Sequence, residues 1–339
     1  MASLHYRHLR RLAAATLAVA ALTTAPALAQ QQIVMKFATL TLNDVQHEYI
    51  KNYKAEIEKV TNNRIKVEIY PAAQLGGAPR QTEGLRLGTI EAATGPSELF
   101  FGADSRFQVL ALAGLFKDNE HARRVIDVPA FRKTFADFTA TRGMINIGLT
   151  VYDHQLIALK TPATKLSDLS GRRLRVLASE GEQASVASLG AAPVPISLPE
   201  VLPALQQGAI DGVSSVLGVF VAFRYYDAAP HVLDTGLWHL MPIVMVSKVW
   251  YDRLPADLQK AVSDTGRKLE ADNHKWQVNR IAEDRKAWTD KGGKFYKLAP
   301  AEQQEAARRV ANAVQGVLAK NAPLKELYDK LKAAAATVN

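Results

Sequence analysis

The chain has 339 residues, of which 48% are hydrophobic and 22% charged, with a net charge of +9 and no cysteine. This composition is typical of a globular protein and excludes disordered, collagen-like and coiled-coil classes. The absence of cysteine excludes disulfide scaffolds, thiol nucleophiles and thiolate metal sites. The length is roughly twice that of a domain of about 100–200 residues, so it predicts two lobes.

Residues 1–29 have the order of a secretory signal peptide. Basic residues (Arg7, Arg10 and Arg11) precede an apolar run over residues 12–22, and a small-residue exit site ends at Ala29. We predict cleavage after Ala29 and a periplasmic mature protein. A membrane anchor is the alternative, but the run is shorter than the ~20 residues that a bilayer requires. No later segment predicts a membrane span.

The remaining chain carries only a mild positive excess, without a dense block of Lys and Arg. Such a pattern does not predict binding to nucleic acid.

The first half of the mature chain predicts alternating strands and helices. Apolar residues recur at steps of three and four after Val45, and they alternate with polar residues from Ile65 to Ile69. The strands are predicted over residues 33–37, 65–70, 90–94 and 144–150, and the helices over residues 45–60, 79–87, 119–126 and 129–141. The β-α-β-α-β order implies a parallel sheet covered by helices.

The second half continues this pattern. Strands are predicted over residues 155–159, 173–176, 192–194, 211–213 and 242–247, and helices over residues 180–189, 199–207, 301–318 and 324–335. No linker rich in proline or glycine separates two independent domains, so we expect two lobes that exchange strands.

A long helix is predicted from Pro255 to Lys291, since proline suits the first helical position and Gly292 the end. Its apolar row changes register between Trp276 and Ile281. Either the predicted register is in error, or the helix packs first on one body and then on another.

The sequence contains none of the common catalytic motifs for hydrolases, zinc proteases, P-loop enzymes or dinucleotide-binding enzymes. Asp153 and His154 are adjacent, but neighbours on a strand point to opposite faces, so a dyad is not expected. The sequence therefore does not predict an enzyme.

Four segments carry a resemblance to a known family. They are residues 70–77 (YPAAQLGG), 83–91 (EGLRLGTIE), 166–176 (LSDLSGRRLRV) and 199–212 (PEVLPALQQGAIDG). In this order and spacing they resemble the periplasmic solute-binding receptors of TRAP transporters, the DctP-type family, over nearly all of the mature chain. The resemblance implies an α/β, two-lobe periplasmic-binding-protein-like fold with an interlobe ligand cleft and a long helix that spans both lobes.

We expect lobe I to comprise residues 30–152 and about 241–280, and lobe II residues 153–240 and about 281–339. The implied function is capture of a small organic acid by hinge closure and its delivery to an ion-gradient-driven TRAP permease in the membrane. The resemblance implies no cofactor and no chemistry by the receptor itself.

The family resemblance also implies binding residues. Arg175 matches the arginine that binds the solute carboxylate, and a guanidinium suits that role because it forms two parallel hydrogen bonds. Leu198 falls at the position of a pocket wall, and Ser215 at that of a polar ligand contact.

Departures from the family pattern suggest a less charged cleft. Thr150 stands where many members have a second arginine, and Tyr152, Phe100 and Trp238 are candidate apolar walls. We therefore expect a monocarboxylate with an apolar or aromatic body.

Glu98 could accept a hydrogen bond from the ligand, or it could be a helix-start acid without a role in binding. Glu98 and Asp153 are the candidates for a metal that bridges protein and carboxylate, but their spacing gives no positive signal, and no metal is predicted.

Two alternative functions remain open from the sequence. The first is a periplasmic sensor of the same fold that acts on a signalling partner. The second, which is less favoured, is an enzyme on a two-lobe α/β scaffold, which would require a catalytic dyad such as Asp153 and His154 in the cleft.

Overall fold

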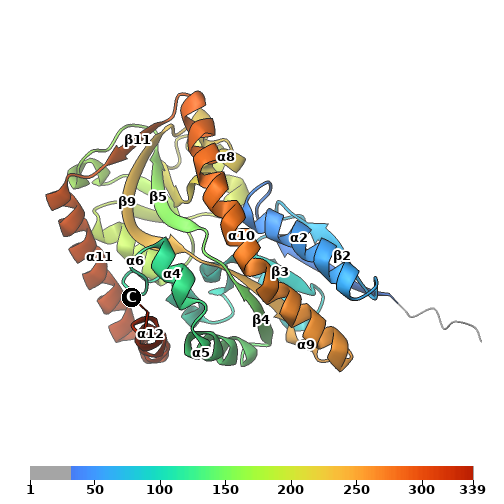
Figure 1. The fold of residues 1–339 in the computed structure, drawn as a ribbon. Helices are drawn as coiled ribbons and strands as arrows, with labels where there is room; N and C mark the ends of the chain where they lie inside the picture. Colours follow the sequence, from blue (N-terminus) through green and yellow to red (C-terminus); the bar gives the residue numbers. More distant parts are fainter. Residues whose placement is uncertain (1–31, 339) are drawn as a thin grey trace, which may run out of the picture.

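Two β-sheets organise residues 32–338, the part of the chain that the computed structural model describes (Figure 1). The first sheet has the strand order β2-β1-β3-β10-β4 and the second has the order β11-β9-β5-β8-β6-β7. The strands of the first sheet are β1 (Ile33–Thr39), β2 (Ile65–Tyr70), β3 (Ala92–Pro96), β4 (Met144–Leu149) and β10 (Pro242–Ser247). Those of the second are β5 (Asp153–Leu159), β6 (Arg173–Val176), β7 (Ala192–Pro195), β8 (Gly212–Ser215), β9 (His231–Leu240) and β11 (Lys294–Lys297).

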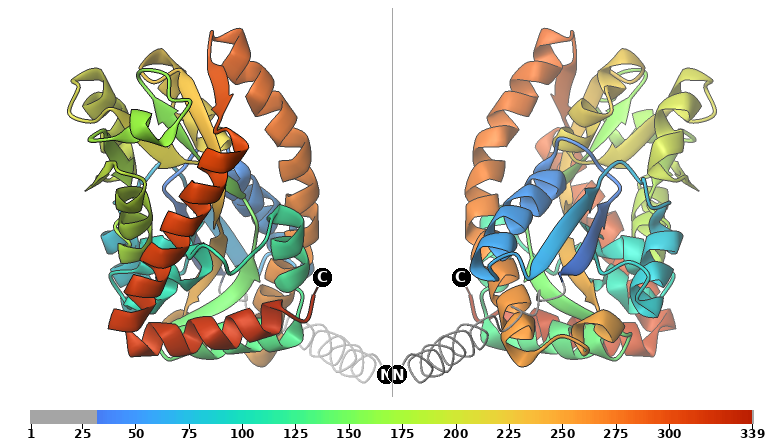
Figure 2. Two further views of the ribbon diagram at one scale, coloured as in Figure 1. Left: turned by 90° about the vertical axis from the view of Figure 1, so that its left-hand side faces the viewer. Right: turned by 90° about the vertical axis from the view of Figure 1, so that its right-hand side faces the viewer.

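Helices cover both sheets (Figure 2). The α-helices are α2 (Val45–Val60), α3 (Ala78–Leu87), α4 (Asn119–Val125), α5 (Pro129–Ala140), α6 (Glu180–Ser188), α7 (Val201–Gln206), α8 (Leu217–Ala222), α9 (Lys248–Tyr251), α10 (Ala256–Asp290), α11 (Pro300–Lys320) and α12 (Ala322–Ala335). The short 3-10 helices are η1 (Ser97–Phe100), η2 (Ser105–Ala111), η3 (Leu166–Leu169), η4 (Leu198–Glu200) and η5 (Tyr225–Asp227).

Both sheets are mixed, whereas the sequence predicted a parallel sheet. Strand β1 pairs in parallel with β2 and β3, as expected, but β10 inserts antiparallel between β3 and β4. Strand β9, which was not predicted, pairs antiparallel with β5. Gly236, which has a φ of 59°, interrupts the alternation of apolar and polar residues along β9. The pairing of β9 with β5 also shifts register between His154 and Leu156. The α/β class itself is confirmed.

Most predicted elements are present. Helix α2 and strands β2 and β10 have the predicted bounds, and α3 ends at Gly88 in the left-handed conformation expected of a glycine cap. Strand β3 begins at Ala92, two residues later than predicted, because Thr89 and Ile90 still bond to the carbonyl of Gly84 in the turn that ends α3.

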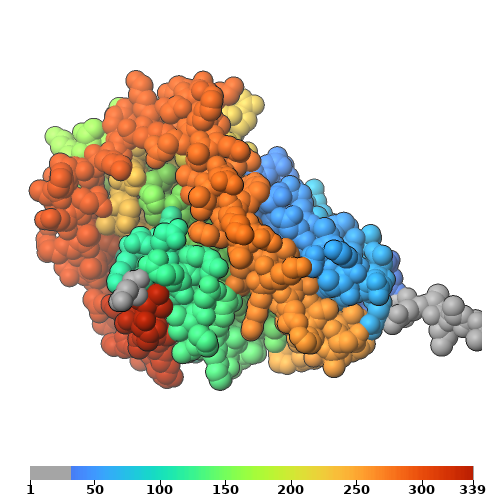
Figure 3. All heavy atoms as spheres, viewed as in Figure 1, coloured from blue at the N-terminus to red at the C-terminus, as the bar shows by residue number. Residues whose placement is uncertain are grey.

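Helix α10 crosses from one sheet to the other, and it lies between α2 and the α4–α5 region on the surface shown in Figure 3. Its N-terminal half packs on the first sheet through Leu258, Val262 and Leu269. Its C-terminal end packs on the second through the fully buried Trp288, whose indole donates to the carbonyl of Pro230 at 3.2 Å.

The middle of α10 shows why its apolar row changes register. The buried side chains between the two cores are polar, namely Asn273, Gln277 and Asp284, whereas Trp276 and Ile281 are only partly buried. The helix therefore contacts two bodies, and the segment between them lacks an apolar face.

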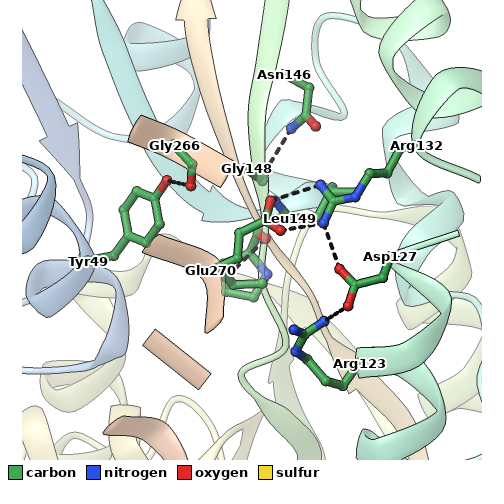
Figure 4. Close-up of polar contacts among 11 residues, drawn as sticks. Tyr49, Arg123, Asp127, Arg132, Asn146, Gly148, Leu149, Gly266 and Glu270 are labelled. Atoms are coloured by element: carbon green, nitrogen blue, oxygen red, sulfur yellow. Dashed lines mark hydrogen bonds and ion pairs between the residues drawn. The ribbon is translucent and has the colours of Figure 1, made fainter. Parts of the chain in front are cut away.

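Close contacts fix α10 to the first sheet (Figure 4). The hydroxyl of Tyr49 donates to the carbonyl of Gly266 at 2.8 Å. One turn later, the buried carboxylate of Glu270 accepts from the backbone N–H of Leu149 at 2.8 Å and from the guanidinium of Arg132 at 3.0 Å. The Tyr49 bond joins α2 to α10, and the Glu270 bonds hold α5 and the end of β4, where the chain leaves the first sheet, against the helix.

The division into lobes stays a prediction, because lobes are defined by their relative motion. Strands of the first sheet lie within residues 33–149 and 242–247, and those of the second within 153–240 and 294–297. Helix α12, which the sequence analysis assigned to lobe II, packs against α5 and η2 beside the first sheet (Figure 2).

The predicted signal peptide, residues 1–29, lies outside the described residues. Within residues 32–338, none of the helices combines the length and the apolar character that a membrane span requires.

Replacing Gly266 with alanine tests the approach of α10 to β4. A Cβ atom at this position would overlap the backbone carbonyl of Ile147, which has no freedom to move aside. We expect Gly266→Ala to lower the free energy of unfolding by roughly 1–3 kcal/mol, despite a gain in helix propensity of up to about 1 kcal/mol.

Urea denaturation measures this change, and Gly316→Ala on α11 is the matched control. No atom lies within 4 Å of a Cβ built at Gly316, so that variant should be neutral or slightly more stable. Equal effects of the two substitutions would contradict the close approach.

Candidate functional site

A small cavity lies between the two sheets, at the carboxyl ends of β1, β3, β6 and β8. Ligands of open α/β sheets commonly bind at this end of the strands. The first sheet and its adjoining segments contribute Leu40, Thr41, Gln46, Pro96 and Leu99, and the second contributes Gln155, Arg175, Leu177, Leu198, Ser214, Ser215, Val219 and Leu240. Of these described lining residues, Arg175 alone carries an ionisable side chain.

The cavity offers about 30 Å³, which suits about two water molecules. A second pocket of about 180 Å³ shares five of its lining residues, including Arg175 and Leu198, and continues towards residues 77–79 and 195–199. The two pockets therefore adjoin each other, and Arg175 lines both.

Strand β6 positions the guanidinium of Arg175. The flanking Leu174 and Val176 are fully buried in the core on the opposite face, so alternation directs Arg175 to the cavity. Arg175 is 3% exposed, and its Nε donates to the carbonyl of Ile196 at 3.0 Å. No carboxylate among residues 32–338 lies within ion-pair distance of it.

Burial without a counter-ion lowers the pKa of Arg175, although Tyr225, Glu182 and Glu98 partly oppose this effect. Arg173, on the same strand, differs from Arg175 in exposure and in pairing. It is exposed, and it forms an ion pair with Asp211 at 2.7 Å. Arg175 therefore presents to the cavity a positive charge that has no ion-pair partner among the described residues.

A polar network supports the wall beside Arg175. The hydroxyl of Ser214 donates to Glu182 at 2.9 Å. With its amide oriented to satisfy its neighbours, Gln155 donates to Glu182 at 3.2 Å and to Ser214 at 3.1 Å, and it accepts from the indole of Trp238 at 3.2 Å. These bonds hold Gln155 and Ser214 in fixed positions at the cavity.

The structure brings together three of the predicted binding residues. Arg175, Leu198 and Ser215 line the same cavity, although they come from β6, η4 and β8. Two further lining residues, Gln46 (3% exposed) and Gln155 (1% exposed), were not predicted from the sequence. The one available signal was that Gln155 is a glutamine at the start of the otherwise apolar predicted strand 155–159.

Four other predicted side chains do not line the cavity. Thr150 donates its hydroxyl to the carbonyl of Pro242 at 3.3 Å, where the chain passes between the sheets. Tyr152 is buried beside Gly218 and donates to Asp44 at 3.2 Å. Trp238 lies behind Gln155, and Phe100 packs in the core of the first sheet against Phe107. The apolar bulk of Tyr152, Phe100 and Trp238 places these three within the hydrophobic cores.

Glu98 lies in η1, directly after β3, and is not part of the cavity wall. Its side chain is 2% exposed, Oε2 accepts from the hydroxyl of Ser97 at 3.3 Å, and Oε1 has no partner among the described residues. Burial raises the pKa of Glu98 to about 8, and the negative charge of Glu182 is the second cause of this rise. Burial likewise raises the pKa of Glu182 to about 7, against the opposing effect of Arg175.

Asp153 and His154 form a contact that the sequence analysis did not expect. The Nδ1 atom of His154 lies 3.0 Å from Asp153, and Nε2 lies 3.0 Å from Asp234. The hydrogen bonds to Asp153 and Asp234 raise the pKa of His154 to about 10. The imidazole is therefore protonated at neutral pH with both nitrogens occupied, which does not suit a general base.

This histidine also lies apart from the Arg175 cavity, beside a separate surface pocket that contains His239 and Asn119. Within residues 32–338, no group of three or more metal-ligating side chains is arranged to hold an ion.

The raised pKa of Glu98 predicts a pH-dependent stability. The folded state holds the proton more tightly than the unfolded chain, so its contribution is complete below about pH 4.5 and is lost as the pH rises through about 8. We expect Glu98→Gln, which cannot ionise, to gain roughly 1–3 kcal/mol relative to the unchanged protein between pH 5 and 9.

Denaturant unfolding across this pH range measures the difference. Glu83→Gln is the control, since Glu83 is exposed on α3 in an ion pair with Arg86. A constant difference between Glu98→Gln and the unchanged protein at every pH would refute the buried, proton-binding carboxyl.

The sequence matches the family model DctP, described as "Bacterial extracellular solute-binding protein, family 7", over residues 37–321. Among curated proteins, it is 29% identical to the C4-dicarboxylate-binding periplasmic protein DctP of Rhodobacter capsulatus over 266 residues, which cover 76% of this chain and 79% of that one. It is 25% identical to the 2,3-diketo-L-gulonate-binding periplasmic protein YiaO of Escherichia coli, over 78% of this chain and 79% of the other.

Solved structures share the fold. The sugar acid binding protein DctPAm of Advenella mimigardefordensis, in complex with galactonate, superposes with a TM-score of 0.85 at 20% identity, over 91% of this chain and 99% of that one. A TRAP periplasmic solute-binding protein of Shewanella oneidensis, with bound succinate, gives a TM-score of 0.81 at 23% identity, over 90% and 100%. These similarities support the two-lobe fold with its sheets and long helix.

Proposed function

The chain belongs to the DctP family of TRAP solute-binding receptors, and we propose that it captures a small monocarboxylate between its lobes through Arg175. The observation that carries this proposal is the buried guanidinium of Arg175, which has one hydrogen bond and no ion-pair partner among the described residues. A carboxylate can accept two parallel hydrogen bonds from the remaining N–H groups and neutralise the charge.

The lining favours one carboxylate with a partly apolar body. Leucine, valine and proline side chains form most of the wall, and the neutral polar groups are those of Thr41, Gln46, Gln155, Ser214 and Ser215. A second ligand carboxylate would enter the site without a second cation to pair with it, which is costly in a buried site. The named relatives and structures bind dicarboxylates or sugar acids, so a carboxylate is the shared chemistry.

Capture requires the site to open. A space of about 30 Å³ cannot admit an organic acid, and the larger pocket beside it is lined by the same arginine. The predicted lobes, residues 30–152 with about 241–280 and residues 153–240 with about 281–339, would separate about the strand crossings and the polar middle of α10. Closure around the ligand would then present the form that a membrane permease recognises in the periplasm.

Substituting Arg175 tests its role. Arg175→Ala removes the cation that pairs with the ligand, so carboxylate affinity should fall by well over tenfold, because loss of a buried charge partner costs about 2–5 kcal/mol. Arg175→Lys keeps the charge without the two parallel bonds and should restore only part of the affinity.

Calorimetric titration measures these affinities, and Arg173→Ala is the matched control. Arg173 lies on the same strand, is exposed, and pairs with Asp211, so its loss should leave affinity unchanged. Unchanged affinity in Arg175→Ala would disprove the assignment.

A ligand panel tests the preference for one carboxylate. We expect phenylacetate, 4-methyl-2-oxopentanoate or L-gulonate to raise the melting temperature and to bind at least about tenfold more tightly than succinate, since a second buried carboxylate lacks a partner. Thermal-shift screening followed by calorimetry gives the comparison. Tighter binding of succinate than of every monocarboxylate would contradict the preference.

A further inference from the structure

Two buried carboxyl groups adjoin residues that line the Arg175 cavity: Glu98 lies between Pro96 and Leu99 in the chain, and Glu182 bonds to Leu177 and Ser214. Glu98 extends from η1 at the end of the first sheet, and Glu182 from α6 beside the second. They are 2% and 5% exposed, and neither forms an ion pair with Arg175. The charges of all three groups nevertheless act on one another.

The two carboxyl groups differ in how they are satisfied. Glu182 accepts from the backbone N–H of Leu177 at 2.7 Å and from the hydroxyl of Ser214 at 2.9 Å. Glu98 has one long bond to Ser97, and its buried Oε1 has no partner in the described chain. A buried carboxylate oxygen without a donor is costly when it is ionised, but a proton removes most of this cost.

On the side of Glu182, helix α6 packs closely against η2. Gly181 donates to the side-chain oxygen of Gln108 at 2.7 Å, and a Cβ atom on Gly181 would overlap Leu112. The cation that acts electrostatically on both carboxyl groups is Arg175. One arginine therefore has to balance the charge of two carboxyl groups.

Ligand binding changes this balance of charge. With both glutamates ionised, a bound carboxylate would bring three negative charges close to one positive charge in a buried site. Protonating one glutamate removes one of the negative charges.

We propose that Glu98 and Glu182 form a proton-binding site beside Arg175, so that the receptor takes up a proton together with its carboxylate ligand. The proton resides on the pair, with Glu98 as its main holder because Oε1 of Glu98 has no other partner. This inference rests on the proposed carboxylate site, and it adds a second bound species to that site.

Calorimetric titration in two buffers counts the protons. Phenylacetate, 4-methyl-2-oxopentanoate and L-gulonate are fully ionised at neutral pH, so any proton uptake comes from the protein. We expect the binding enthalpy at pH 8 to differ between phosphate and Tris buffer by an amount equivalent to about 0.5–1 proton per ligand. Affinity should fall by roughly three- to tenfold per pH unit above pH 8.

Variants assign the proton. Glu98→Gln should still bind the monocarboxylate but take up less than about half as many protons, whereas the exposed control Glu83→Gln should match the unchanged protein. Glu182→Gln provides a second test if Glu98→Gln melts much earlier.

Three results would contradict the proton site. Monocarboxylate binding with the same enthalpy in both buffers would overturn the proton site alone, as would full proton uptake by both variants. Binding that requires sodium, seen by replacing sodium with choline, would show a cation in place of the proton. Failure of every carboxylate to bind at any pH would overturn the proposed function as well.

Discussion

A buried positive charge without a counter-ion lowers the stability of the folded protein, because the charge has lost its hydration. The candidate site contains such a charge, the guanidinium of Arg175. Arg175 lies on β6, between β8 and the edge strand β7 of the second sheet, and it is 3% exposed with one hydrogen bond to a backbone carbonyl. The cost of such burial is several kcal/mol unless a partner arrives. The fold keeps nearby carboxylates out of ion-pair range, and this leaves the charge available to a ligand.

The first sheet contributes to the same site because the chain returns to it. Strand β10, which follows β5–β9 of the second sheet in the chain, lies between β3 and β4 of the first sheet. Helix α10 comes next and contacts both sheets. The Glu270 carboxylate joins α10, α5 and the end of β4 at the point where the chain leaves the first sheet (Figure 4). A motion between the sheets therefore has to act through a few crossings and the polar middle of one helix.

How far the sequence predicts this structure depends on the range of the signal. Helix α2 and strands β2 and β10 were predicted with their observed bounds. Apolar residues recur at steps of three and four in α2, alternate with polar residues in β2, and form a short continuous run in the fully buried β10. Strand β9 was missed because a glycine in the left-handed conformation breaks its alternation. The buried polar residues of α10 were missed because a hydrophobic pattern cannot report polar burial.

The sequence by itself determined the α/β class and the long connecting helix, because both depend on local periodicity. The proposed role of Arg175 came from the resemblance of residues 166–176 to a family motif. Only the tertiary structure decided which groups surround that arginine. Gln46, Gln155 and Glu98 come from segments far apart in the chain, and their roles depend on burial and on which polar atoms find partners. Tyr152 and Trp238 were predicted to line the cavity, but they pack inside the protein. Which side chains fill a close-packed core depends on all the elements that surround it, and a local sequence pattern does not contain this information.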